Sequence, residues 1–145
     1  MGCGVRMETR IERREQFTVK GYEMKGAVTE IPKLWDELNG KIAEKGKRPD
    51  ESFGITLGIE NGKFHYLAGI KEELAKDFSD AKELTIPEGR FIVAKVEGDV
   101  DAIPAAFDAL MRNTDVTLRH SYGFERYIHP EGSKEYETEV WVAIK

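Results

Sequence analysis

Two side chains near the end of the sequence have the types and the spacing to act on one bound group. Glu125 and Tyr127 stand two residues apart in the segment GFERY, and alternate residues of a strand point to the same face. A carboxylate enclosed by aromatic side chains is costly when it is ionised and unpaired, so it either takes up a proton or binds a cation. Each aromatic face would add about 0.5–2 kcal/mol of cation–π attraction. The pair therefore predicts a receptor for a cation.

The same two residues also fit an enzyme that needs no cofactor. A glutamate with a raised pKa can activate water, while a phenol can donate a proton to a leaving group. In that case Glu125 and Tyr127 would be the catalytic residues. The ordinary alternative is that Glu125 lies on the surface beside Arg126 or Arg119, with Tyr127 packing on a strand. The residues alone leave these alternatives open.

A repeated octet indicates which elements position this pair. Residues 31–38 and 103–110 share the pattern I-P-x-x-aromatic-D-x-L, 72 positions apart. Proline is tolerated in a first helical turn, and both copies place apolar residues at helical spacing. We expect helices from 31 to about 45, ended by Gly46 at the left-handed cap position, and from about 102 to 113. Trp35 and its counterpart Phe107 lie on the apolar stripes of these helices.

Strand patterns surround both predicted helices in the same order. The first half gives strands at about 13–25, 53–60 and 63–71, and the second half at 90–97, 122–129 and 136–145. Asn61-Gly62 between alternating segments is a strong signal for a type I′ hairpin, whereas 130–134 forms a longer loop. We therefore predict a single α+β domain over 1–145. It consists of two β-α-β-β halves, about 7–71 and 84–145, joined by a connector at 72–83 and sharing one antiparallel sheet.

A two-residue turn fixes the hairpin register, so side chains can be assigned to faces. Pairing Leu57 with Tyr66 and Ile55 with Ala68 predicts one apolar packing face, on which Tyr66 belongs to the core. The opposite face is small, with Gly54, Thr56 and Gly58. Transferring these faces to the second half places on that face the side chains of Glu125, Tyr127, Glu139 and Trp141. We expect a cleft between the two helices here, with Trp35 both in the core and beside the ligand.

Bulk properties exclude several other classes of protein. The 145 residues carry a formal net charge of −5, which argues against a nucleic-acid surface. Apolar runs are too short for a membrane span, and a single Cys3 fits a reducing, cytoplasmic compartment. His65, His120 and His129 lack the spacing of metal ligands, and no phosphate-binding glycine motif occurs. We expect neither metal nor cofactor.

Together, these features resemble the GyrI-like effector-binding domains, found in AraC-type and MerR-type regulators and as free-standing proteins. The resemblance is carried by residues 123–127, the I-P-x-L-W helix, the terminal strand 139–145 and the tandem halves, and it runs from about Met7 onward. It implies SHS2-type halves with a ligand cleft, in which the family's F-E-x-Y glutamate matches Glu125 with Tyr127 beside it. It also implies binding of lipophilic, often cationic compounds, and in some free-standing members hydrolysis of strained electrophiles.

We therefore expect a free-standing cytoplasmic protein that senses or sequesters lipophilic, cationic or electrophilic small molecules. The expected ligand-binding residues are Glu125, Tyr127, Trp141 and Trp35. A hydrolase using Glu125 and Tyr127 is the alternative. A protein-interaction inhibitor is the second alternative, because the family's founding members act on gyrase. We expect no direct binding to nucleic acid or membrane.

Overall fold

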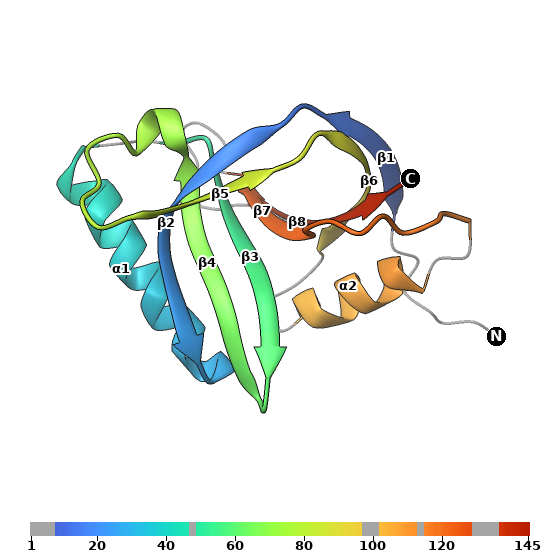
Figure 1. Cartoon of the computed structure of the whole chain (residues 1–145), viewed down its shortest axis with the longest axis horizontal. Helices are drawn as coiled ribbons and strands as arrows, with labels where there is room; N and C mark the ends of the chain where they lie inside the picture. The colour runs from blue at the N-terminus through green and yellow to red at the C-terminus, as the bar shows by residue number, and fades with distance from the viewer. Residues whose placement is uncertain (1–7, 47–48, 97–101, 113–114, 129–136) are drawn as a thin grey trace.

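Eight strands form one curled antiparallel sheet, and two helices pack against it (Figure 1). The computed structural model describes residues 8–46, 49–96, 102–112, 115–128 and 137–145. The sheet order is β1-β6-β8-β7-β3-β4-β2-β5. In chain order the elements are β1 (Thr9–Arg14), β2 (Phe17–Gly26), η1 (Val28–Glu30), α1 (Ile31–Glu44), β3 (Glu51–Glu60), β4 (Lys63–Lys71), η2 (Glu72–Leu74), β5 (Lys82–Ile86), β6 (Gly89–Val96), α2 (Ile103–Met111), β7 (Phe124–Ile128) and β8 (Glu137–Ile144).

The predicted order β-α-β-β occurs twice, as β2-α1-β3-β4 and as β6-α2-β7-β8. Each repeat is preceded by a further strand that we did not predict as a separate element. β1 pairs with β6 of the second repeat, and β5 pairs with β2 of the first, so the two repeats exchange these strands. Pro87, which cannot donate a ladder hydrogen bond, separates β5 from β6. The predicted connector 72–83 overlaps the beginning of β5, which starts at Lys82.

Both helices begin where the octets place them. Pro32 and Pro104 each lie in a first turn, and Gly46 has the positive φ of 67° expected after α1. α1 packs on β2 and β4, and α2 packs on β6 and β8. The centre of the sheet, where β3 pairs with β7, therefore lies between the strands that carry the two helices. The predicted loop 130–134 and Cys3 lie outside the described residues.

The β3–β4 hairpin confirms the predicted turn but not the whole register. Asn61 and Gly62 both have positive φ, 51° and 76°, as a type I′ turn requires. Ile59 pairs with Phe64, in the register that this turn sets, but the register shifts between Thr56 and Gly58, so that Thr56 pairs with Tyr66. The predicted pairing of Leu57 with Tyr66 is therefore wrong. A bulge of one residue moves every later side chain of β4 to the other face.

Side chains are buried on both faces of the sheet, so the prediction of one packing face is also wrong. We call the face on which α1 and α2 lie the helix face, and the opposite one the inner face. The inner face carries an aromatic core of Phe53, Phe91, Phe124 and Trp141. On the helix face, one cluster lies under α1 and another under α2. Trp35 packs against both of these clusters, because it lies toward the middle of the sheet.

Candidate functional site

Glu125 lies at the centre of the sheet, on the helix face. It is on β7 and pairs with Gly54 of β3, at the junction of the two repeats. Its residue exposure is only 7%. The sheet alternation that carries Glu125 to this face carries Tyr127 there as well, since Tyr127 belongs to the cluster under α2. The prediction that these two side chains share a face is confirmed.

Four side chains meet around this carboxylate, and we call them the Glu125 cluster: Glu125, Tyr127, Tyr66 and Trp35. The Tyr127 hydroxyl donates to Glu125 Oε1 at 2.5 Å, and the Tyr66 hydroxyl donates to the same oxygen at 3.0 Å. Trp35 Nε1 donates to the Tyr66 hydroxyl oxygen at 3.1 Å. The Trp35 and Tyr127 rings meet edge to face, with centroids 4.9 Å apart. α1, β4 and β7 thus each contribute to one aromatic enclosure of a carboxylate.

Gly54 makes this enclosure possible. Tyr66 reaches from β4 across β3 to the carboxylate on β7, and it passes over the position where a Gly54 side chain would stand. A Cβ there would collide with the Tyr66 hydroxyl and lie 3.1 Å from Glu125 Oε1. A glycine inside a strand often marks such a close approach.

The electrostatics of Glu125 set it apart from the other buried carboxylates. Burial raises the pKa of Glu125 from 4.5 to about 7, against the lowering effect of the hydrogen bonds from Tyr127 and Tyr66. Burial also acts on Glu51, but hydrogen bonds from Lys71, Arg126 and Arg14 outweigh it and lower that pKa to about 2. Among the described residues, Glu51, Glu125 and Glu139 are the buried carboxylates, and of the three Glu125 alone has no ion pair.

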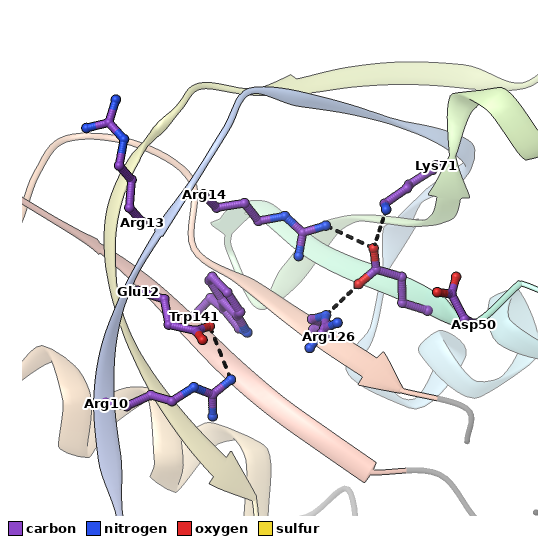
Figure 2. Close-up of a pocket in the computed structure, with 9 residues that line it drawn as sticks. Arg10, Glu12, Arg13, Arg14, Asp50, Lys71, Arg126 and Trp141 are labelled. Carbon is purple, nitrogen blue, oxygen red and sulfur yellow. Dashed lines mark hydrogen bonds and ion pairs between the residues drawn. The ribbon is translucent and has the colours of Figure 1, made fainter. Parts of the chain in front are cut away.

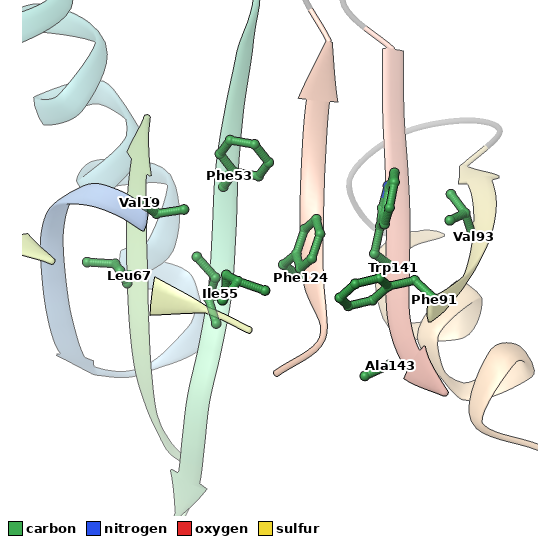
Figure 3. Packing of buried hydrophobic residues seen from close by; sticks show 10 residues of the cluster. Val19, Phe53, Ile55, Leu67, Phe91, Val93, Phe124, Trp141 and Ala143 are labelled. Carbon is green, nitrogen blue, oxygen red and sulfur yellow. The ribbon is translucent and has the colours of Figure 1, made fainter. Parts of the chain in front are cut away.

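Trp35 joins Glu125 and Tyr127 as expected, but Trp141 does not lie on their face. Trp141 pairs directly with Phe124, so it points to the inner face and stacks on the Phe124 ring, with centroids 5.3 Å apart (Figure 3). The placement of Trp141 and Glu139 beside Glu125 is therefore wrong. The prediction assumed that equivalent strands of the two repeats present their side chains to the same faces. It failed for β8, because no two-residue turn fixes the register between β7 and β8 as Asn61-Gly62 does for the first hairpin.

The surface alternative for Glu125 also fails. Arg126 lies on the inner face, where its guanidinium contacts Glu51 and Glu139. Arg119 donates to the backbone oxygens of Ile144 and Arg90. Glu139 is also buried on the inner face, at 6% exposure, and is paired with Arg10 and Arg126.

Tyr66 is the member of the Glu125 cluster that the sequence patterns did not reveal. It is buried as predicted, at 1% exposure, but its hydroxyl faces the carboxylate. The available signal was Gly58, because a glycine within a strand suggests a bulge, and a bulge there moves Tyr66 to the face of Glu125.

The position expected to be an open cleft is filled by Trp35 and the two tyrosines. No group of three potential metal ligands occurs within the described residues, and no helix among them is long and apolar enough to cross a membrane.

Comparison with known proteins agrees with this fold and places the chain in a family. Residues 7–145 match the model of the GyrI-like small molecule binding domain. The transcriptional regulator BrlR of Pseudomonas aeruginosa is 29% identical over 109 residues, which cover 72% of this chain and 40% of BrlR. The chain thus spans less than half the length of that relative.

Two solved structures share the fold along most of the chain. SAV2435 bound to tetraphenylphosphonium superposes with a TM-score of 0.67 at 17% identity, covering 96% of this chain and 94% of that one. The EcmrR C-terminal domain gives 0.66 at 14% identity, covering 96% and 98%. An eight-stranded α+β sheet with an enclosed carboxylate at its centre is therefore set in a fold shared with a ligand-bound protein. The chain belongs to the GyrI-like small molecule binding domain family.

Replacing Gly54 tests the close approach of Tyr66. In Gly54→Ala the new methyl group displaces the Tyr66 hydroxyl, and we expect a loss of about 1–3 kcal/mol in the free energy of unfolding. Gly58→Ala is the matched control, because a Cβ there meets nothing within 4 Å, and it should change stability by less than about 0.5 kcal/mol. Urea denaturation measures both. Equal effects of the two substitutions would contradict the proposed crossing.

Replacing Glu125 tests its raised pKa through stability. The folded-state pKa of about 7 exceeds the unfolded value of 4.5, so the folded protein binds more protons between these pH values, and stability falls as pH rises through them. Glu125→Gln removes this penalty while keeping an acceptor for both phenols. We expect the variant to gain up to about 3 kcal/mol over wild type between pH 4.5 and pH 8. A stability difference that stays constant with pH would contradict the assignment.

Proposed function

We propose that this domain binds lipophilic organic cations against the Glu125 carboxylate and so senses or sequesters them. The observation that carries the proposal is the contrast among the buried carboxylates. Glu51 and Glu139 each have cationic partners within the protein, whereas Glu125 has phenols only. A cationic ligand would supply the missing partner.

The surroundings of Glu125 favour a large, apolar cation over a metal ion. Its oxygen Oε1 accepts two phenol hydrogen bonds, and the rings of Tyr66, Tyr127 and Trp35 surround it. Aromatic faces attract organic cations by about 0.5–2 kcal/mol each, while strongly hydrated metal ions demand several oxygen ligands. The relative SAV2435, whose structure contains tetraphenylphosphonium, supports the same class of ligand.

Trp35 is the side chain through which such a ligand would reach the carboxylate. Tyr66 and Tyr127 are buried, at 1% and 8% exposure, but Trp35 is only partly buried. Its ring lies between the clusters under the two helices. A ligand approaching from solvent therefore meets the Trp35 ring first, and its binding should change the fluorescence of this residue.

A titration with tetraphenylphosphonium, followed by Trp fluorescence, tests the proposal. We expect Glu125→Gln to weaken binding by about ten- to a hundredfold, as the loss of a charged partner does. As the pH increases toward 7, wild-type affinity should rise about tenfold per pH unit, because the ligand competes with a proton for the carboxylate. Above pH 7 the affinity should level off. The Glu125→Gln variant should show a flat profile.

Glu60→Gln serves as the control, since it makes the same charge change at an exposed position on the β3–β4 hairpin. It should leave affinity unchanged. Equal affinity of wild type and Glu125→Gln would rule out charge complementation. If wild type instead turned over a strained electrophile, and both Glu125→Gln and Tyr127→Phe abolished that turnover, the hydrolase alternative would replace the binding function.

A further inference from the structure

A second recess lies on the inner face of the sheet, on the opposite side of β7 from the Glu125 cluster. It has a volume of about 420 Å³, and Figure 2 shows Arg14, Lys71 and Arg126 pointing toward one another beside Trp141. Its lining comes from β1, β3, β4, β7 and β8 and includes Arg10, Arg14, Glu51, Lys71, Arg126 and Trp141. The proposed cation site uses none of these residues.

Cations exceed carboxylates within this recess. Glu51 accepts from Arg14 and Lys71, both at 2.9 Å, and from Arg126 at 2.5 Å. Arg126 is shared with Glu139, which also pairs with Arg10 at 2.6 Å. Four cations therefore share two buried carboxylates. Glu12, which is half-buried, also pairs with Arg10 at 3.3 Å. Asp50 is exposed, and water screens such a charge strongly.

Arg14 has a fixed position, and its guanidinium has more N–H donors than it uses among the described residues. Its guanidinium lies 4.1 Å above the Phe17 ring and 5.2 Å from the Phe53 ring, and its side chain is 16% exposed. Among the described residues, its side chain donates only to Glu51, through Nη2. Lys71 likewise pairs only with Glu51 in this part of the chain. Both groups line the recess, so donors are available on two of its walls.

We propose that this recess binds a small oxyanion, a phosphate or carboxylate group, between Arg14 and Lys71. A guanidinium fork matches the oxygens of either group, and an ammonium adds a point charge. The anion would offset the excess positive charge that the two carboxylates leave. Since the whole chain carries a net charge of −5, a recess with the opposite sign concentrates anions locally. The domain would then bind ligands of opposite charge on the two faces of β7.

Inorganic phosphate and citrate are the probes that test this site, each titrated at constant ionic strength. The chain has two tryptophans, so in a Trp35→Phe background only Trp141 in the recess reports binding. We expect saturable binding of at least one probe, and Arg14→Gln should weaken it by about tenfold or more. Tighter binding of phosphate would identify a phosphate ligand, and tighter binding of citrate a carboxylate ligand.

Arg112→Gln is the matched control, because Arg112 is a highly exposed arginine on the C-terminal end of α2 and should leave affinity unchanged. In Arg14→Gln, Glu51 keeps its ion pairs with Lys71 and Arg126, so circular dichroism should show that the variant is folded. If Arg14→Gln does not fold, Lys71→Gln provides an independent test. Failure of both probes to saturate, or equal weakening in Arg112→Gln, would overturn the proposal.

Discussion

The burial of one uncompensated carboxylate is the constraint on which the rest of this structure depends. Glu125 stands on the central strand pair, where the sheet and the aromatic side chains exclude water. An ionised carboxylate in such a place needs a cation or several strong donors. The protein supplies two phenol hydroxyls, which stabilise the charge only in part, and the pKa of the group rises to about 7.

The repeat explains how a chain of this size builds such a place. β3 and β7 are equivalent strands that pair at the middle of the sheet, and each helix covers the strands outside this pair. One repeat contributes Gly54, which has no side chain, and the other contributes Glu125. The asymmetry leaves room for Tyr66 to cross from β4. The scaffold is therefore repeated, whereas the chemistry depends on the positions at which the two copies differ.

Local signals made much of this predictable. The two proline-started helices and the Asn61-Gly62 turn depend on residues close in sequence, and they occur where expected. The shared face of Glu125 and Tyr127 follows from strand alternation alone. Tyr66 and Trp141 were misplaced because their faces depend on a bulge and on the register between β7 and β8, which no short motif specifies. The exchange of β1 and β5 between repeats is likewise a long-range pairing, and the buried ion pairs of Glu51 and Glu139 with Arg10 and Arg14 depend on it.

The protonation of Glu125 itself can be observed directly. A carbon-13 NMR titration of the glutamate side-chain carboxyls, with the Glu125 signal assigned by its loss in Glu125→Gln, reports the midpoint for this group. We expect a midpoint near pH 7 in the free protein and a lower midpoint when tetraphenylphosphonium is present, because a bound cation favours the ionised form. A midpoint near pH 4.5 that the ligand does not move would show that Glu125 is neither destabilised by burial nor the partner of the cation.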